Sequence, residues 1–248
     1  MKRLIPKSFY DLYYKFYYKF NHLEENRIQK KLYKKNDAKS TFTHIYKNKK
    51  WLFDVNKSLS GPGAELEQTR AITNFLPVIF LKYNITSIYD IPCGDFNWMK
   101  EVELSKIDYT GGDIVDELIE SNTKKHSFKN INFIKINILE SSTLIDLKKK
   151  DLLLCRDCLI HFSNKDVLKA LNNICKSQCK YLLASTYPGA RKNKNIVTGM
   201  WRPINLTLKP FSLPEPLEII DEKDQECSSK YPRKHIALWD IKEIKKIL

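Results

Sequence analysis

Two acidic residues stand at the ends of short β-favouring runs in the first half of the chain. The run Ser87-Ile-Tyr-Asp90 enters the turn Pro92-Cys-Gly-Asp95, and the run beginning at Tyr109 ends at Asp113. A tight turn after a buried strand lies at the carboxyl end of a sheet, where open α/β folds bind ligands. A carboxylate at the end of the next strand, about twenty residues on, can accept both hydroxyls of a ribose. The spacing therefore predicts a site for a ribose-containing ligand.

A second group of reactive side chains follows the apolar run Leu152-Leu-Leu-Cys155. Arg156, Asp157 and His161 come directly after it. Asp157 and His161 are four residues apart, so a helical turn would place them on one side. An imidazole has an ordinary pKa that suits a general base, which makes His161 a candidate. The alternative is a histidine that caps or packs the turn.

Strand and helix patterns alternate through the middle of the chain, which predicts a parallel sheet with helices on both faces. The expected strands cover residues 87–91, 109–113, 131–137, 151–156 and 180–186. The expected helices lie near 96–104, 115–125 and 164–177. An earlier helix begins around Pro62 and runs to about Tyr83, and Pro77 is expected to kink or split it.

Four prolines between residues 187 and 215 argue against a regular helix there and favour a long structured loop. This loop offers Trp201, Arg202 and Asn205, a combination that suits sugars and anions, and Tyr187 precedes it. The alternative is a hydrophobic plug that shields the site. Two last strands, Leu217–Glu222 and His235–Trp239, are expected to form an antiparallel pair.

The positive charge is concentrated at the N-terminus. Residues 1–57 carry 15 Lys or Arg and 5 Asp or Glu, which is +10 of the net +14. We therefore expect a basic helical arm over 1–57 and a ligand-binding domain over 58–248. The aromatic stretch Phe9–Phe20 is expected to pack on the domain, on another subunit or at a membrane interface. A membrane contact would involve residues 1–35.

No stretch of the chain has the length of a membrane span or the apolar centre of a secretory signal, so a cytoplasmic location is expected, with peripheral contact at the inner face of the membrane as one option. Cys155 and Cys158 have a C-x-x-C spacing, and Cys175 and Cys179 are one helical turn apart. We expect buried thiols at these positions instead of zinc ligands or disulfides.

Together these segments resemble the class I S-adenosylmethionine-dependent methyltransferases, which have a Rossmann-like α/β sheet. Of the three glycines in the family's first motif only Gly94 is present, with Pro92 and Phe96 at the other two positions. The runs Asp-Ile-Pro-Cys-Gly-Asp-Phe-Asn-Trp-Met, Cys-Arg-Asp-Cys-Leu-Ile-His and Gly-Met-Trp-Arg-Pro-Ile-Asn resemble, more narrowly, small bacterial methyltransferases associated with surface-polysaccharide assembly.

The resemblance implies S-adenosyl-L-methionine as the cofactor and assigns residues to it. The residues beside its methionine part would be Asp90, Cys93, Gly94, Asp95 and Trp98. Asp113 and Ile114 would hold the ribose, Asn137 and Ile138 the adenine, and Arg156 would complete the wall. The expected reaction is O-methylation of a sugar or phosphate-type group on a small-molecule or glycan acceptor, with His161 or Asp157 as base and Tyr187, Trp201, Arg202 and Asn205 binding the acceptor.

Two other functions remain open at this point. A nucleic-acid methyltransferase would use the basic, Tyr-rich arm, but the Asn/Asp-Pro-Pro-Tyr/Phe motif of amino-directed enzymes is missing. A non-catalytic cofactor-binding module is compatible with the single glycine, although the acids Asp90 and Asp113 argue against it.

Overall fold

The computed structural model describes residues 27, 29–35, 37–52, 57–145, 147–222 and 232–248. Its strands are β1 (Ser87–Asp90), β2 (Asp108–Asp113), β3 (Ile131–Lys135), β4 (Leu152–Cys155), β5 (Tyr181–Thr186), β6 (Glu218–Asp221) and β7 (His235–Asp240). Its α-helices are α2 (Ala38–Lys47), α3 (Leu66–Lys82), α4 (Asp116–His126), α5 (Ser141–Ile145), α6 (Asn164–Lys176) and α7 (Ile241–Ile244). Single 3₁₀ turns are η1 (Pro62–Ala64), η2 (Met99–Glu101) and η3 (Leu159–His161).

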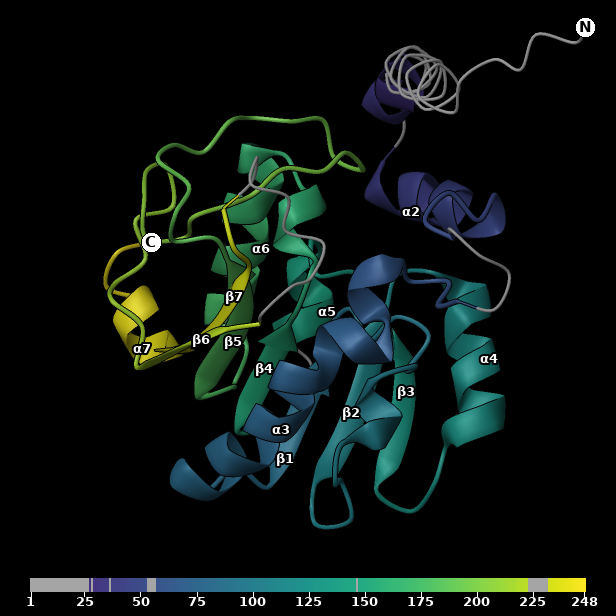
Figure 1. Ribbon diagram of the computed structural model, residues 1–248, viewed down its shortest axis with the longest axis vertical. Coiled ribbons are helices and arrows are strands. Elements are labelled where there is room, and N and C mark those ends of the chain that lie inside the picture. The colour runs from purple at the N-terminus through teal and green to yellow at the C-terminus, as the bar shows by residue number, and fades with distance from the viewer. Residues whose placement is uncertain (1–26, 28, 36, 53–56, 146, 223–231) are drawn as a thin grey trace, which may run out of the picture.

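The described strands form one sheet in the order β3-β2-β1-β4-β5-β7-β6 (Figure 1). Strands β1 to β5 pair in parallel, and β7 runs antiparallel to both β5 and β6. The strand order changes direction between β1 and β4, and a ligand crevice is expected outside the carboxyl ends at such a point. The predicted parallel sheet and its final antiparallel pair are confirmed.

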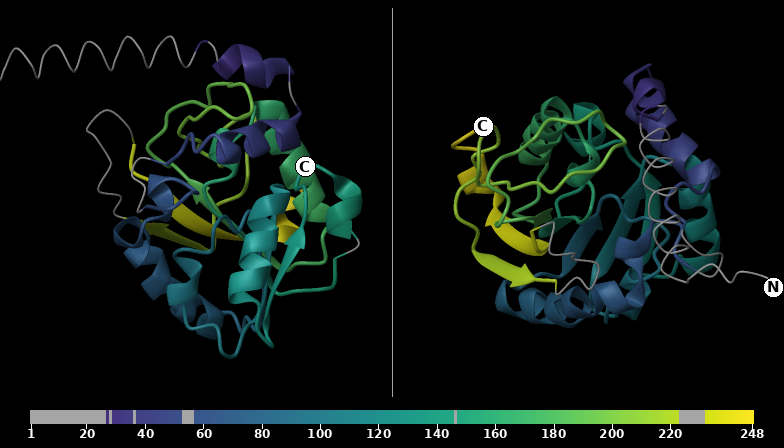
Figure 2. Two further views of the ribbon diagram at one scale, coloured as in Figure 1. Left: turned by 90° about the vertical axis from the view of Figure 1, so that its right-hand side faces the viewer. Right: turned by 45° about the horizontal axis from the view of Figure 1, so that its top comes forward.

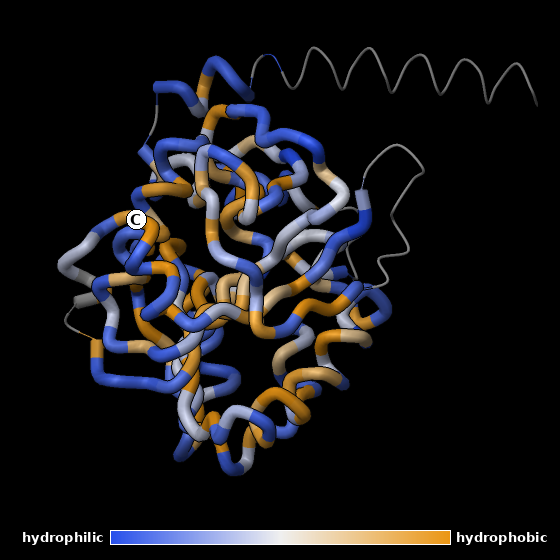
Figure 3. Tube along the Cα trace, turned by 90° about the vertical axis from the view of Figure 1, so that its left-hand side faces the viewer, coloured by the Kyte–Doolittle hydropathy of each residue, from blue (hydrophilic) through white to orange (hydrophobic). Residues whose placement is uncertain are grey.

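Alternating side chains of the strands bury both faces of the sheet. In β4, Leu152 and Leu154 pack with Ile72 and Leu76 of α3. Leu153 and Cys155 point the other way and pack in the core that contains α6. The right-hand view of Figure 2 shows the sheet between α3 and α6. Figure 3 shows hydrophobic stretches along the central strands and hydrophilic stretches over much of the outer turns. This two-sided burial explains why the central strands are apolar throughout.

Two helix predictions differ from the structure. The helix expected near 96–104 is only the 3₁₀ turn η2, because Phe96 has a positive φ of 58° that no α-helix accepts. Pro77 does not split α3, which is continuous from Leu66 to Lys82. An interior proline costs about 3 kcal/mol. The buried Ile72 and Leu76 before it and Ile79 and Phe80 after it outweigh that cost.

Residues 187–217 contain no regular helix or strand, as the prolines predicted. The loop is nevertheless ordered by buried side chains, including Phe211 and Leu213. The Asn193 amide donates to the carbonyl oxygens of Asn205 (2.8 Å) and Lys209 (3.0 Å), and this closes the loop on itself. The cysteines at 93, 155, 158, 175 and 179 are buried free thiols, which confirms the expected burial.

The described part of the N-terminal arm lies against the domain. Helical residues 29–35 and helix α2 lie at one end of the molecule, near the loop that follows β5 (Figure 1). Lys39 and Lys47 of α2 form ion pairs with Asp116 and Glu117 at the start of α4. The aromatic stretch 9–20 lies outside the described residues. None of the described helices has the length and apolarity that a bilayer-spanning helix needs.

Candidate functional site

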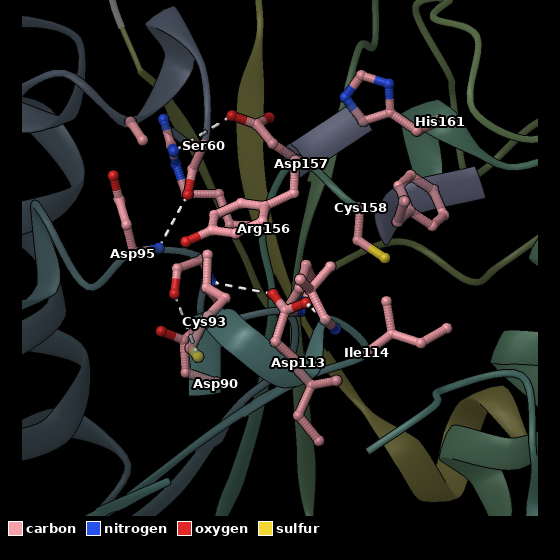
Figure 4. A pocket seen from close by; sticks show the side chains of 18 of the residues that line it. Ser60, Asp90, Cys93, Asp95, Asp113, Ile114, Arg156, Asp157, Cys158 and His161 are labelled. Carbon is pink, nitrogen blue, oxygen red and sulfur yellow. Dashed lines mark hydrogen bonds and ion pairs between the residues drawn. The ribbon is translucent and has the colours of Figure 1, made fainter. Parts of the chain in front are cut away.

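A cavity of about 140 Å³ opens at the carboxyl ends of β1, β2 and β4. One water needs roughly 10–15 Å³ of such space, so the cavity has room for a ligand much larger than an ion. Its walls come from the turns after the strands, from the segment before η1, and from α2 (Figure 4). The cavity contains every residue that the sequence assigned to the cofactor or to the base: Asp90, Cys93, Gly94, Asp95, Trp98, Asp113, Ile114, Asn137, Ile138, Arg156, Asp157 and His161.

The turn after β1 is tied to the segment that precedes η1. Asp95 accepts hydrogen bonds from the Ser58 hydroxyl (2.8 Å) and the Leu59 amide (2.8 Å). The Asp95 amide in turn donates to Ser60 Oγ at 2.9 Å. Gly94 has φ +57°, and a Cβ there would collide with the Ser60 hydroxyl. Only glycine therefore allows the two segments to approach this closely.

Asp113 ends β2 and faces the same turn. Its Oδ1 accepts the Val115 amide at 3.0 Å, and its Oδ2 accepts the Gly94 amide at 3.3 Å. Burial raises the pKa of Asp113 to about 6, although these backbone donors favour the charged form. The carboxylate thus reaches across from β2 to the β1 turn, where a ribose acid is expected.

Asp90 is the most deeply buried acid of the cavity. Its Oδ2 accepts the Tyr109 hydroxyl at 2.9 Å. Burial raises the pKa of Asp90 to about 7, and the neighbouring Asp113 charge adds to the increase. Asp90, Asp95 and Asp113 together place three carboxyl groups in the cavity wall.

Asn137 follows β3, where the sequence predicted contact with adenine. It lines the cavity, but its side chain bonds within its own turn. Its Nδ2 donates to Glu140 Oε1 at 2.8 Å, and its Oδ1 accepts the Leu139 amide at 3.0 Å. The Asn137 amide that was expected to contact adenine is therefore engaged within its own turn.

Arg156 belongs to a buried cluster of four charges. Its Nε and Nη2 donate to Glu222 Oε2 at 2.9 and 2.6 Å, and its Nη1 donates to the Gly63 carbonyl at 2.8 Å. The guanidinium also lies 5.3 Å from the Trp98 ring centre. Burial alone would lower the pKa of Arg156, but Asp157 and Glu222 hold it above its usual range. Arg156 thus directs its hydrogen bonds to Glu222 and Gly63, while its charge also favours the ionised form of Asp90.

Asp157 is the second acid of this cluster. Lys234 Nζ donates to its Oδ2 at 2.9 Å, Arg156 Nη1 lies 3.2 Å from the same atom, and the Ser185 hydroxyl bonds to its Oδ1. Burial alone would raise its pKa, but Arg156 and Lys234 hold the pKa of Asp157 well below its usual range. A carboxylate with so low a pKa is a weak base. The structure therefore favours a positioning role for Asp157 over the predicted role as base.

His161 ends η3 and faces the cavity. Its Nδ1 lies 3.1 Å from the Met200 carbonyl oxygen, which can only accept, so the proton resides on Nδ1 and Nε2 keeps its lone pair. Burial lowers the pKa of His161 to about 4, which leaves the ring neutral at pH 7. Trp51 stacks on the ring with centroids 4.7 Å apart. The structure thus presents an oriented, neutral imidazole to the cavity.

The four residues predicted to bind the acceptor lie outside the cavity lining. The Arg202 guanidinium is buried and donates to the carbonyl oxygens of Leu159 (2.8 Å) and Phe162 (2.9 Å). The Asn205 amide donates to the Pro188 and Ala190 carbonyls. Both side chains hold the loop in place. Tyr187 is buried and makes an edge contact with Trp201, which is 41% exposed.

The sequence analysis missed one wall of the cavity, which comes from the arm. Phe42, Ile45, Tyr46 and Trp51 line it, and Phe42 packs on Phe162 with ring centres 5.7 Å apart. Ser60 was missed as well. The spacing of Phe42, Ile45 and Tyr46, at intervals of three and four, is the available signal of a helix with one apolar face.

Comparisons with known proteins identify the fold. No family model matches the sequence, and no curated protein matches it. Among solved structures, magnesium protoporphyrin IX methyltransferase from Synechocystis PCC 6803 with bound SAM is similar, with a TM-score of 0.55, 12% identity, and coverage of 83% of this chain and 98% of that chain. A SAM-dependent methyltransferase from Anabaena variabilis has a TM-score of 0.55 and 14% identity over 82% and 94% of the two chains.

The N-methyltransferase NodS from Bradyrhizobium japonicum is similar over 70% of this chain and 96% of that chain, with a TM-score of 0.51 and 14% identity. The chain has the α/β Rossmann-like fold of the class I methyltransferases.

Proposed function

We propose that this protein is an S-adenosylmethionine-dependent methyltransferase that O-methylates a sugar or phosphate-type group of a bacterial surface glycan or its precursor. The observation that carries the first part is the acidic cavity at the carboxyl ends of β1 and β2. Asp90, Asp95 and Asp113 line it, and its one lining arginine, Arg156, is committed to Glu222.

The charge of this cavity separates two classes of nucleoside ligand. A dinucleotide brings a pyrophosphate that must lie on the glycine turn and the following helix N-terminus. Here that turn is flanked by carboxylates and is followed by no regular helix. S-adenosylmethionine instead brings an ammonium and a sulfonium, which three nearby carboxylates attract. The cavity therefore suits the sulfonium ligand.

The residues present fit the parts of that ligand. Asp113 would accept the ribose hydroxyls, Asp90 or Asp95 would attract the ammonium group, and Ile114 and Ile138 would enclose the adenine. When bound, S-adenosylmethionine would supply a methyl group that a nucleophile attacks in line, with the thioether S-adenosylhomocysteine as the leaving group. The protein would align the methyl donor with the acceptor and exclude water from the cavity. This alignment of the two reactants is the main source of rate acceleration in such a reaction.

The acceptor is proposed to be a hydroxyl. A sugar hydroxyl needs a base at the moment of attack. Nε2 of His161 offers a lone pair in the cavity that no described residue binds, and burial, which lowers the pKa of the ring to about 4, makes it a weaker base than an exposed histidine. The glycan class itself is supported only by the resemblance of three sequence runs to enzymes of surface-polysaccharide assembly.

Calorimetric titration of the purified protein tests the cofactor. We expect binding of S-adenosylmethionine and no binding of NAD under the same conditions. Binding of NAD without S-adenosylmethionine would overturn the proposal. Transfer of a labelled methyl group to candidate sugar nucleotides and glycan fragments, with the product identified by mass spectrometry, tests the acceptor. Methylation of an amine instead of a hydroxyl would contradict the O-methylation part.

A further inference from the structure

One face of the protein carries a concentration of cations that form no ion pair with any described residue. Residues 27–35 contain five Lys or Arg and no acidic residue. Lys30, Lys31, Lys34 and Lys35 are exposed, and so are Arg191, Lys192 and Lys194 in the loop after β5. Within the described part of the chain none of these side chains is in an ion pair. We call these two segments, 27–35 and 191–195, the basic face.

The two segments of the basic face are fixed to one scaffold. Tyr33 is only 3% exposed, and a Cβ added at Gly199 would lie 2.8 Å from its ring. The Gly199 amide donates to the His161 carbonyl at 2.8 Å, and Asn195 Oδ1 accepts the Asn164 amide at 2.8 Å. Both segments are therefore held near η3, whose His161 lines the cavity.

The chain that leads into this face has a composition suited to a membrane interface. Between Phe9 and Phe20, eight of twelve residues are Phe or Tyr, and Lys15 and Lys19 are four apart. These residues lie outside the described part, so only their composition is used. Aromatic rings and lysines together favour the boundary between headgroups and acyl chains.

We propose that the basic face docks the protein on an anionic lipid surface, with the cavity end turned toward the bilayer. Stable attachment to a membrane needs two signals, a cationic patch and an apolar or lipid anchor. The basic face supplies the cationic patch, and the composition of residues 9–20 suits the apolar signal. A stretch this dense in aromatic residues favours a bilayer over nucleic acid, because base-stacking proteins combine aromatic rings with a positively charged groove that tracks the backbone.

The expected strength follows from the number of cations. Each lysine near an anionic membrane surface contributes about fivefold to the partition coefficient. Replacing four of them should therefore weaken binding on the order of 10³-fold at low salt, and added salt should weaken the binding of the unaltered protein as well. The docking does not depend on the proposed methyl transfer, because binding is measured without any cofactor or acceptor.

Co-sedimentation of the full-length protein with vesicles tests the proposal. The vesicles are phosphatidylcholine alone or phosphatidylcholine mixed with phosphatidylglycerol. One variant changes Lys30, Lys31, Lys34 and Lys35 to Gln. The matched control changes four exposed lysines at the opposite end of the sheet, Lys124, Lys125, Lys148 and Lys149, to Gln. Both variants have the same net charge, and thermal unfolding checks that both are folded.

We expect binding to anionic vesicles only, its loss in the first variant, and its retention in the control. Equal loss in both variants would mean that overall charge is responsible and would overturn the assignment to this face. Absence of binding to anionic vesicles would overturn the proposal altogether. If the protein did not bind anionic vesicles but bound single-stranded RNA tightly, nucleic acid would be the partner instead.

Discussion

At the scale of single residues, burial of carboxylates determines the electrostatics of the cavity. Asp90 and Asp113 both have raised pKa values because the surrounding protein solvates the charged form poorly. A cationic ligand would supply the missing compensation. These acids therefore couple ligand binding to protonation, and they can be tested one at a time.

Asp113→Asn should weaken binding of S-adenosylmethionine by at least about 10²-fold, because two hydrogen bonds to a charged acceptor contribute about 1.5–3 kcal/mol each. Calorimetry measures the change. The matched control is Glu120→Gln, seven residues on, whose ion pair with Lys135 is exposed. That control should leave the affinity unchanged, and an unchanged affinity in Asp113→Asn would remove Asp113 from the cofactor site.

The affinity for S-adenosylmethionine should rise as pH increases from about 5 to about 7. Asp113 and Asp90 ionise in the unliganded protein at pKa values of about 6 and about 7, and the ionised forms attract the ligand.

The stability of the unliganded protein should change in the opposite direction. Both pKa values exceed the ordinary value of 3.8, so the folded state holds extra protons below about 7 and loses stability as pH rises through this range. Calorimetry across pH measures the affinity, and denaturant titration across pH measures the free energy of unfolding. If both quantities changed in the same direction with pH, the assignment would be wrong.

His161→Ala should lower turnover by about 10²–10⁴-fold, the usual contribution of a general base, with cofactor affinity near that of the unaltered protein. Single-turnover methyl transfer measures the chemical step. His235→Ala provides the control, because that histidine lies on β7 outside the cavity lining. Normal turnover in His161→Ala would indicate an acceptor that is already anionic.

At the scale of elements, the cavity depends on segments that are distant in sequence. The turn after β1 is closed by residues 58–60, and helix α2 closes the side opposite the strands. Helix α2 is held over the cavity by its ion pairs to α4 and by the Phe42–Phe162 contact. The arm is therefore part of the site, so a truncation must spare α2 if the cavity is to remain intact.

Trp51→Ala should lower turnover more than cofactor affinity, because the Trp51 ring stacks on His161 and helps to orient it. Removal of residues 1–26, by contrast, should leave cofactor affinity unchanged. Calorimetry and single-turnover transfer on both variants separate the two effects.

The comparison for this change is Trp201→Ala, which removes an indole of the same size outside the cavity lining. It should affect turnover less than Trp51→Ala. A larger effect at Trp201 would restore the loop after β5 as the acceptor-binding element.

At the scale of the whole molecule, the buried charges of Arg156, Asp157, Glu222 and Lys234 join the central strands to the antiparallel edge. Arg156 follows β4, Glu222 follows β6 and Lys234 precedes β7. Arg156 also holds Gly63, where an added Cβ would lie 2.8 Å from Asp157 Oδ2. The cluster therefore couples the sheet edge to the turn that closes the cavity.

Lys234→Met should lower the free energy of unfolding by about 3 kcal/mol, because it leaves Asp157 and Glu222 with one cation between them in a buried place. Urea denaturation measures the loss. The neighbouring Arg233→Met removes an exposed pair with Asp221 and should cost at most about 0.5 kcal/mol. Equal losses in the two variants would show that the buried cluster has no special role in stability.

The strands, their order of occurrence and the acids at their ends could be predicted from the sequence because they depend on near neighbours. Leu152–Cys155 is apolar throughout since both faces of β4 are covered, and Gly94 is a glycine since its turn needs a positive φ. The helix predicted near 96–104 is absent for a local reason as well, the positive φ of Phe96. A phenylalanine in the sequence does not indicate a positive φ.

Tertiary structure alone decided which side chains remain available to a ligand. Asp157 accepts a hydrogen bond from Lys234, 77 residues away. The buried Arg202 guanidinium donates to backbone carbonyl oxygens 40 and 43 residues before it. The arm brings Trp51 onto His161 from more than a hundred residues away in the chain. Residue type and spacing thus determined which groups could do chemistry. Long-range packing decided which of them are free to do it, because a charge or donor that finds a buried partner no longer has that capacity for a ligand.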